Sequence, residues 1–382
     1  MSLYTGTAKL TYDGKTRDVL LSLDLNEYCL VAKHPQDNDP FQYVVDRERL
    51  WSLSDLCLTD VNIPTANGTL WTTKVDELFI ATYSPGASSI HDSMLNRSFQ
   101  ISNDSAGIVT IKLMPAQSIV EFDYTPLSGN LNELFYVANF ASFPPFSCDA
   151  GGVTYRAVEK RPNLSVQSSA PLWTDERRIR LAFSLLQGAP IFLLAGYEEH
   201  KARINLLRPR VYQPSHRLYD HYKDAPDVLD HLLRFSMALS MQDFHHWEKA
   251  AGFLLEGKAS YAEADIRVTN LFVFIEMFDE SRTLSGNSLS AMMSISLSDA
   301  KFLCEVRNRL VHEKHDLSEA IRDAQSELIC HDPSHVLTHF DISGHKHPAT
   351  TNLLIRLCER LNFYVAQQIG WNGTWNAYKS IL

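Results

Sequence analysis

Short runs of alternating hydrophobic and polar residues, separated by turn residues, fill the first part of the chain. Residues 7–12 alternate, Asp13 and Gly14 form a turn pair, and residues 18–23 alternate again. An Asp-Gly pair between such segments is typical of a two-residue hairpin. The same pattern predicts further strands at 43–45, 56–61, 70–73, 78–83, 97–101 and 108–113. This spacing favours a sandwich or a strongly curved antiparallel sheet in residues 1–150.

A mixed region follows. Apolar residues at helical spacing predict a helix from Asp175 to Leu186, which Gly188 ends. Residues 190–197 read as a buried strand and residues 203–207 as another, with a turn between them.

From residue 216 onward the apolar positions recur with the period of a helix. The pattern predicts helices at 227–255, 260–278, 317–329 and 350–369, and one more that begins at a cap formed by Ser298 and Asp299. Residues 281–298 and 330–350 read as loops. We therefore expect an α+β protein: a β-rich domain over 1–215, with a basic mixed segment at 156–215, and a bundle of four or five helices over 216–382.

Composition sets the broad class. The 382 residues are 45% hydrophobic, enough for more than one core, and no run of about 18 apolar residues predicts a membrane span. The N-terminus has no basic start and no apolar segment typical of a secretory signal. Six scattered cysteines fit free thiols in a reducing cytoplasm better than a disulfide framework. We expect a cytoplasmic protein without membrane association.

The charge is unevenly distributed. A net charge of −10 argues against a general nucleic-acid coat protein. Residues 156–217, however, hold 11 Lys and Arg against five acidic residues. Arg203, Arg208 and Arg210 in this segment are candidate RNA contacts. The alternative is a solvated surface with internal ion pairs.

The candidate chemistry lies in residues 302–313, where Leu303, Val306, Leu310 and Val311 form the apolar stripe of a helix. The same helix carries Arg307, Asn308 and His312. A guanidinium matches two oxygens of a phosphodiester and keeps its charge, and a histidine carries protons near neutral pH. These groups are sufficient to promote attack of a ribose 2′-hydroxyl on the adjacent phosphate without a metal.

Helical geometry makes the site incomplete in one chain. Asn308 and His312 are one turn apart and share a face, whereas Arg307 lies about 100° away at its edge. One helix supplies one histidine, although in-line RNA cleavage gains from both a base and an acid. A second copy across a two-fold axis would supply the other, so we expect a homodimer or higher homo-oligomer with a composite site, to which Arg309 adds positive charge. The alternative from spacing alone is that these are surface or capping groups.

The string Val306-Arg307-Asn308-Arg309-Leu310-Val311-His312 resembles the R-N-x-x-x-H signature of HEPN-domain proteins. A preceding helix with an acidic residue, Glu276, and a closing amphipathic helix at 353–361 extend the resemblance over about 216–382. With the β-rich first half, the whole layout is similar to ApeA-like proteins of bacterial anti-phage defence.

The resemblance implies a metal-independent endoribonuclease that acts by abortive infection, with no cofactor. Arg307 would bind the scissile phosphate, His312 would move the proton, and Asn308 would orient them; Glu276 is a weaker candidate that could hold Arg307. The substrate would be tRNA or another structured RNA, and a phage protein is a possible trigger for the N-terminal sensor domain. The alternative function is a catalytically inactive scaffold that only dimerises or binds a partner.

A crowded set of metal-binding residue types offers a different interpretation. Five histidines and a cysteine lie between 330 and 347: Cys330, His331, His335, His339, His345 and His347. Three of the histidines, His331, His335 and His339, have i, i+4, i+8 spacing. Such a row on a helix would bind zinc. Pro333 and Gly344 argue against one continuous helix, so we expect a loop without a metal site.

Overall fold

The structure, a computed structural model, describes residues 3–12, 14–24, 29–33, 56–65, 68–76, 78–82, 90–92, 97–99, 102–103, 109–115, 119–127, 132–137, 145–160, 163–206, 216–219, 222–259, 261–279, 284–329, 340–342, 345–347 and 349–372. The predicted strand at 43–45 lies outside the described residues, as do Arg208, Arg210 and most of the histidine-rich segment.

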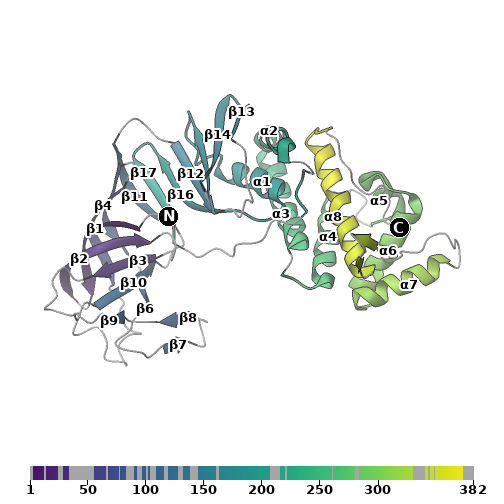
Figure 1. The fold of residues 1–382 in the computed structure, drawn as a ribbon, viewed down its shortest axis with the longest axis horizontal. Coiled ribbons are helices and arrows are strands. Elements are labelled where there is room, and N and C mark those ends of the chain that lie inside the picture. Colours follow the sequence, from purple (N-terminus) through teal and green to yellow (C-terminus); the bar gives the residue numbers. More distant parts are fainter. Residues whose placement is uncertain are drawn as a thin grey trace. The chain divides into compact units, whose positions relative to one another are not determined.

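The chain forms two compact units that interleave along the sequence. The strand unit comprises Met1–Val137, Ser165–Trp173 and Leu193–Arg210, and the helical unit comprises Ala138–Leu164, Thr174–Phe192 and Val211–Leu382. The predicted order, an antiparallel β-rich region followed by a helical region, is confirmed (Figure 1). The division differs from a single boundary between 215 and 216, because a hairpin and a helix from the mixed region belong to the helical unit.

One antiparallel sheet dominates the strand unit. Its strands follow the order β15-β12-β16-β17-β11-β5-β4-β1-β2-β3-β10-β6, with β9 also on β10, while β7 and β8 pair with each other. Their bounds are β1 Leu3–Tyr12, β2 Lys15–Asp24, β3 Cys29–Lys33, β4 Cys57–Pro64, β5 Gly68–Val75, β6 Leu78–Thr82, β7 Ile90–Asp92, β8 Arg97–Phe99, β9 Ser102–Asn103, β10 Val109–Pro115, β11 Ile119–Pro126, β12 Asn132–Val137, β15 Asn163–Ser168, β16 Phe192–Glu198 and β17 Lys201–Asn205.

The first hairpin shows how the alternating pattern sets the register. Tyr12 pairs with Lys15, so the turn has two residues, as predicted, and Gly14 adopts a φ of 69° that favours glycine. Leu10 lies opposite Leu58 of the next strand, and both side chains are fully buried. Alternate residues of these strands therefore build one apolar core.

The helical unit begins with a hairpin and continues almost entirely with helices. The bounds are β13 Phe146–Ala150, β14 Val153–Lys160, α1 Glu176–Gln187, a 3₁₀ turn at Tyr222–Asp224, α2 Ala225–Ala238, α3 Met241–Lys258, α4 Ala264–Phe278, α5 Gly286–Met293, α6 Leu297–Val311, α7 Leu317–Ile329, β18 Phe340–Ile342, β19 His345–His347 and α8 Ala349–Gln368. No helix in the described ranges is both long enough and apolar enough to cross a membrane.

Two predictions about these helices are wrong, for local reasons. The expected helix at 227–255 is two helices, because Leu239 is extended and the Ser240 hydroxyl accepts a hydrogen bond from the Asp243 amide, which starts α3. The expected loop at 281–298 contains α5, which a reciprocal capping box between Ser285 and Ser288 starts. The described residues after 216 therefore contain more helices, α2 to α8, than the four or five that we expected.

Aromatic side chains and one close backbone contact hold α3, α4 and α8 together. Phe278 of α4 packs with ring centroids 4.5 Å from Trp247 of α3 and 5.7 Å from Tyr364 of α8. A Cβ added at Gly257 of α3 would lie 2.5 Å from the Leu271 side chain and 2.9 Å from the Arg267 carbonyl oxygen. Only glycine lets α4 approach this closely, and α4 carries Glu276.

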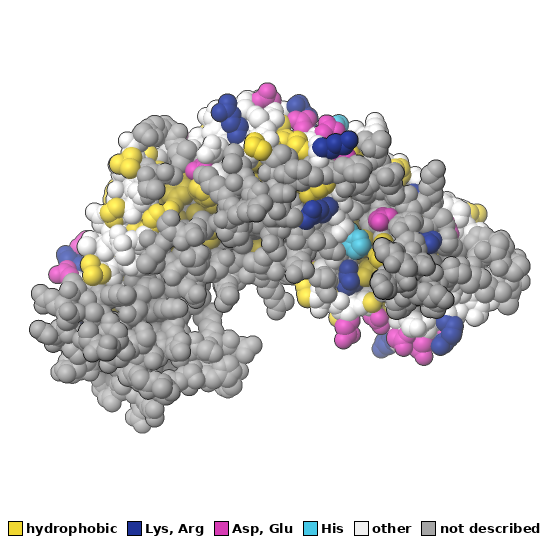
Figure 2. Space-filling model, in the orientation of Figure 1, with side chains coloured by type: hydrophobic (Ala, Val, Ile, Leu, Met, Phe, Trp, Pro, Cys, Tyr) yellow, Lys and Arg dark blue, Asp and Glu magenta, His cyan; other side chains and the backbone are white. Residues whose placement is uncertain are grey.

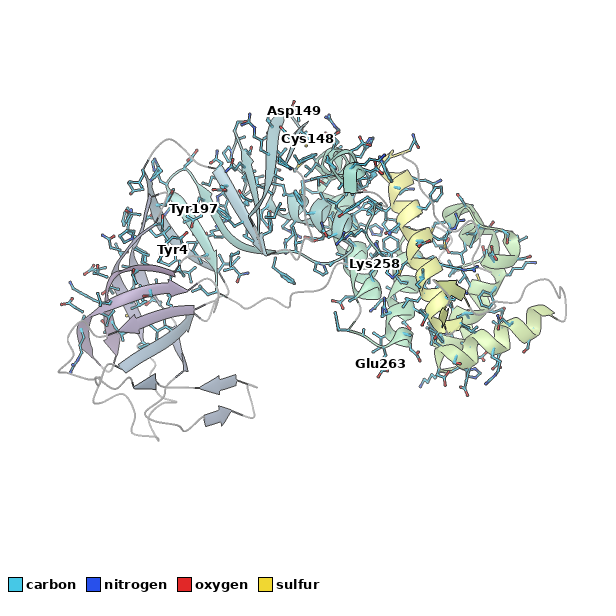
Figure 3. All side chains as sticks on the ribbon, viewed as in Figure 1. Tyr4, Cys148, Asp149, Tyr197, Lys258 and Glu263 are labelled. Carbon is cyan, nitrogen blue, oxygen red and sulfur yellow. The ribbon has the colours of Figure 1, made fainter. Side chains whose placement is uncertain are left out.

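The Lys258 side chain is buried within the same packing, and the partly buried side chains of His216 and Arg267 lie near it; Figure 3 labels Lys258 among the helices. The Lys258 ammonium donates to the Asn362 side-chain oxygen, and Arg267 donates to the carbonyl oxygens of Gly257 and Lys258, each at 3.1 Å. Burial lowers the pKa of Lys258 to about 8. Burial, with the charges of Lys258 and Arg267, lowers the pKa of His216 to about 4.

The described surface carries both signs of charge. On the face drawn in Figure 2, basic and acidic side chains are interspersed among the coloured residues. This agrees with the net charge of −10.

Candidate active site

Helix α6 carries the candidate catalytic residues, and its ends differ slightly from the predicted ones. The Ser296 hydroxyl accepts from the Asp299 amide at 3.0 Å, so Ser296 is the cap, in place of the predicted Ser298-Asp299 pair. The helix ends at Val311. The amide of His312, the C-cap residue, still donates to the Asn308 carbonyl at 2.9 Å, which fixes the backbone of His312 beside the last turn.

The expected apolar stripe of α6 is only partly buried. Leu303 and Val306 have no exposed surface, Leu310 is half-buried, and Val311 at the end of the helix is 39% exposed. The buried residues fix the rotation of α6 about its axis. With this rotation, the Arg307 side chain lies between α6 and α4, where it reaches Glu276.

Glu276 of α4 holds the Arg307 guanidinium from one side. Its Oε1 lies 2.7 Å from Arg307 Nε and 2.6 Å from Arg307 Nη2. The Arg307 side chain is 19% exposed and that of Glu276 is 36% exposed. The pair is thus shielded enough to be ordered, yet solvent still reaches it. This contact joins two helices that are 31 residues apart in the sequence.

The remaining donor, Arg307 Nη1, faces the other two candidate residues. It donates to Asn308 Oδ1 at 3.1 Å and lies 2.7 Å from His312 Nε2. A guanidinium can only donate, so this contact requires a lone pair on Nε2 and places the imidazole proton on Nδ1. The structure therefore brings Arg307, Asn308, His312 and Glu276 into one hydrogen-bonded set, the Arg307 cluster, with Arg307 at its centre.

Arg309 is not part of the Arg307 cluster. Its Nη2 lies 2.6 Å from Glu327 of α7 and its Nη1 lies 3.5 Å from Glu313. A guanidinium with two carboxylate partners is largely neutralised, so Arg309 connects α6 to α7 and adds little positive charge to the cluster.

Cys304 lies on α6 one turn before Asn308, and its thiol is a potential nucleophile next to the Arg307 cluster. Burial raises the pKa of its thiol to about 11, an effect that Glu305 reinforces and Arg307 opposes. The thiolate is the nucleophilic form of cysteine, so a thiol with this pKa is inert at neutral pH. Cys304 is therefore not a candidate nucleophile.

The predicted RNA contact that the structure describes, Arg203, lies in the strand unit. It donates from Nε to Glu121 at 2.5 Å, and its guanidinium lies 3.9 Å from the centre of the Trp173 ring. Other cations of the basic segment are also paired, Lys201 with Asp123 and Arg177 with Glu248. The described part of this segment therefore fits a solvated surface with internal ion pairs, the alternative interpretation.

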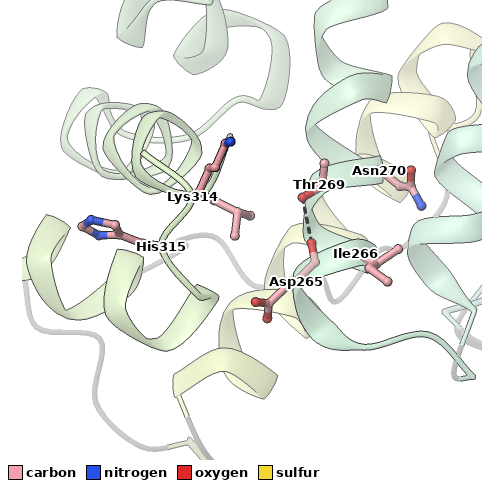
Figure 4. A pocket seen from close by; sticks show the side chains of 7 residues that line it. Asp265, Ile266, Thr269, Asn270, Lys314 and His315 are labelled. Carbon is pink, nitrogen blue, oxygen red and sulfur yellow. Dashed lines mark hydrogen bonds between the residues drawn. The ribbon is translucent and has the colours of Figure 1, made fainter. Parts of the chain in front are cut away.

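An open pocket of about 370 Å³ continues the seam between α4 and α6 (Figure 4). It is lined by Asp265, Ile266, Thr269, Asn270, Leu310, Lys314 and His315. Sequence reasoning missed these residues, because a pocket depends on which helices pack together. The one available signal was Asp265, Ile266, Thr269 and Asn270 at helical spacing on the segment that carries Glu276.

The described residues contain no group of three or more histidine, cysteine or acidic side chains suited to a metal ion. His345 and His347 occupy β19, where only their backbone is described, and the other members of the histidine-rich segment lie outside the described ranges.

Comparison of the chain with protein-family models, with curated proteins and with solved structures gives no match. The function is therefore inferred from the chemistry of the Arg307 cluster and from its surroundings.

Proposed function

We propose that the protein is a metal-independent endoribonuclease, of the HEPN and ApeA-like kind that its sequence resembles. One observation carries the proposal: a guanidinium held by a carboxylate on one side faces an imidazole lone pair 2.7 Å away on the other. A phosphate that binds Arg307 would lie next to His312. A phosphodiester and a proton acceptor would thus meet at one place.

The proposed reaction needs no group beyond the RNA and the protein. When a phosphate binds, Arg307 Nη1 turns from His312 Nε2 to the non-bridging oxygens and neutralises the developing charge. The freed lone pair of His312 Nε2 then accepts the proton of the ribose 2′-hydroxyl. The 2′-oxygen attacks phosphorus, and the bond to the 5′-oxygen breaks as that oxygen takes a proton. The products are a 2′,3′-cyclic phosphate and a 5′-hydroxyl.

A homodimer would complete the site. One Arg307 cluster holds one imidazole, and the leaving 5′-oxygen needs an acid, which His312 of a second copy would supply. Val311, exposed next to His312, is apolar surface that a second copy would cover. In this proposal the strand unit senses a trigger such as a phage protein, and cleavage of tRNA or another structured RNA causes abortive infection.

Cleavage of total cellular RNA by the purified full-length protein tests the proposal. We expect new 5′-hydroxyl ends with and without chelator, and none with His312→Ala or Arg307→Ala. Arg309→Gln is a matched control, because it removes an arginine from the same helix but outside the Arg307 cluster. Cleavage by His312→Ala at the wild-type rate would falsify the catalytic assignment.

A second candidate function is a catalytically inactive scaffold. Its support is that Arg307 contacts Glu276, Asn308 and His312 of its own chain, so that the cluster is internally satisfied. In that case the purified protein forms its oligomer but leaves RNA intact under every condition. Arg307→Ala then lowers stability or oligomerisation and nothing else. Sedimentation of the variant, together with the cleavage assay, distinguishes the two functions.

A further inference from the structure

The pocket lies further along the α4–α6 seam than the Arg307 cluster, one turn away on α6 and two turns away on α4. Leu310 lines it, and Leu310 is three residues after Arg307, one turn further along the same face of α6 and about 4.5 Å further along the axis. On α4, Thr269 lines the pocket seven residues before Glu276, on the same face. The pocket therefore continues the groove in which a phosphate on Arg307 would lie.

The lining combines apolar surface with two polar groups that are available to a ligand. Ile266 of α4 is 53% exposed, an unusual state for isoleucine, and Leu310 of α6 lines the same pocket. The Asn270 amide makes no hydrogen bond within the described part of the chain, and the Lys314 ammonium is exposed.

The other polar lining groups are either engaged in hydrogen bonds or turned away from α4. The Thr269 hydroxyl donates to the Asp265 carbonyl at 2.8 Å, as Figure 4 shows, and the Asp265 carboxylate accepts from the Leu317 amide at 3.2 Å. His315 Nδ1 lies 3.4 Å from Asp323 without forming a hydrogen bond, and the ring is turned away from the α4 residues in Figure 4. Asn270 and Lys314 are thus the groups that would recognise a ligand.

Lys314 is held in a conformation that lysine rarely adopts. Its φ is 61°, in the left-handed region, which costs a non-glycine residue about 1 kcal/mol or more. Neighbouring hydrogen bonds impose it: the Glu313 amide donates to the Asn308 carbonyl at 3.3 Å, and the His315 amide donates to the Arg309 carbonyl at 3.2 Å. Glycine would fit this turn better, so the lysine side chain at the pocket is a candidate for function.

We propose that this pocket binds one unpaired nucleoside of the RNA next to the scissile phosphate, an inference that rests on the proposed ribonuclease function. The base packs against Ile266 and Leu310, its edge pairs with the Asn270 amide, and Lys314 contacts the flanking phosphate. A volume of about 370 Å³ suits a single small ligand and is too small for a duplex. The substrate is therefore RNA with a splayed base, as in a loop or a single strand.

Binding and cleavage by three pocket variants test the proposal: Asn270→Ala, Ile266→Ala and Lys314→Gly. The glycine variant removes the side chain while easing the backbone. Affinity is measured on the His312→Ala background, by fluorescence anisotropy, with single-stranded oligonucleotides that differ in one base. We expect each pocket variant to weaken binding by at least about fivefold and Asn270→Ala to erase the preference among bases. Gln242→Ala, which removes an exposed amide on α3, should change neither.

The outcomes separate the pocket from the catalytic assignment. If the wild type cleaves RNA and all three variants keep its affinity and its base preference at the cut site, the nucleoside pocket is wrong and the ribonuclease stands. If the wild type does not cleave, but Asn270→Ala still removes base-selective binding, the pocket stands and the ribonuclease is wrong. If no oligonucleotide binds the wild type or the His312→Ala protein, both are wrong.

Discussion

Helix α4 contributes to two regions that contain basic side chains. On the side of α6, Glu276 pairs with Arg307, and solvent reaches both side chains. On the side of α3, Arg267 lies near the fully buried Lys258. The first cation has a carboxylate partner. In the second region, the described contacts of Arg267 and Lys258 are with neutral oxygens of Gly257, Lys258 and Asn362.

The two regions differ in burial and in the charge of the partners of each basic side chain. A cation that is partly exposed and paired with a carboxylate stays charged, and it can exchange a neighbour for a phosphate at little cost. A cation buried among neutral oxygens has lost its hydration, so it lowers stability and its pKa falls. We therefore expect changes in the seam to affect reaction rate and changes in the interior to affect stability and its dependence on pH.

The largest expected effect on stability concerns Lys258→Met. The folded-state pKa of Lys258, about 8, is below the ordinary lysine pKa of 10.5, so between these pH values the unfolded chain binds the extra proton. The free energy of unfolding should rise with pH across this window by about 3 kcal/mol, and below pH 8 the full cost of the buried charge is present. In the variant this rise should disappear.

Urea denaturation at a series of pH values from 7 to 10.5 measures the effect. Lys249→Met is the matched control, because Lys249 is an exposed lysine on the same helix. The difference between the two variants isolates Lys258 from the tyrosines and cysteines that titrate in the same range. Equal slopes in both variants would contradict a charged, buried Lys258.

A smaller effect, this time on rate, is expected from Glu276→Ala. Without the carboxylate, Arg307 keeps its charge but loses its orientation, and such misplacement lowers kcat by about 10- to 100-fold. Thermal stability should change little, because Glu276 is partly exposed. Cleavage rates measured over a range of RNA concentrations give kcat and KM. Glu276→Asp should restore part of kcat without changing KM; an equal loss in both variants would show that Glu276 does not position Arg307.

A feature of this structure could be predicted from the sequence when the residues that form it are close together along the chain. The hairpin at Asp13-Gly14 was predictable because the turn residues themselves determine it. The set of Arg307, Asn308 and His312 was also visible, because residues of one helix turn are neighbours wherever the helix packs. The hydrogen bond from Arg307 to Asn308 depends on side-chain geometry that spacing does not reveal.

The interior was not predictable in this way. A lysine at the end of a helix, such as Lys258, reads as a surface residue, and its burial depends on the packing of α3 against α4 and α8. The break between α2 and α3 was missed because Leu239 and Ser240 are neither glycine nor proline, and a single side-chain cap decides it. The α4–α6 pocket depends on the same tertiary packing.

Alanine substitution of two glycines in α3 tests how closely α3 and α4 pack. Gly257→Ala forces a Cβ against Leu271 and the Arg267 carbonyl, so we expect a loss of about 1–3 kcal/mol in the free energy of unfolding. A Cβ at Gly252 would meet nothing within 4 Å, so Gly252→Ala should raise stability by up to about 1 kcal/mol. Denaturant unfolding of both variants gives the measurement. Effects of the same sign would mean that α4 does not approach α3 at Gly257.

The smallest effect is expected from Arg309→Gln, which tests whether position or only charge matters on α6. Arg309 lies two residues from Arg307 but pairs with Glu327, whose side chain is 52% exposed. Exposed pairs contribute about 0–1 kcal/mol, so the loss of stability should stay within that range. RNA cleavage should fall by less than about threefold, because Glu327 and Glu313 already neutralise Arg309. A loss of cleavage as large as that of Arg307→Ala would show that the cleft needs the summed charge of both arginines, and the Arg307 cluster alone would then be an incomplete description of the site.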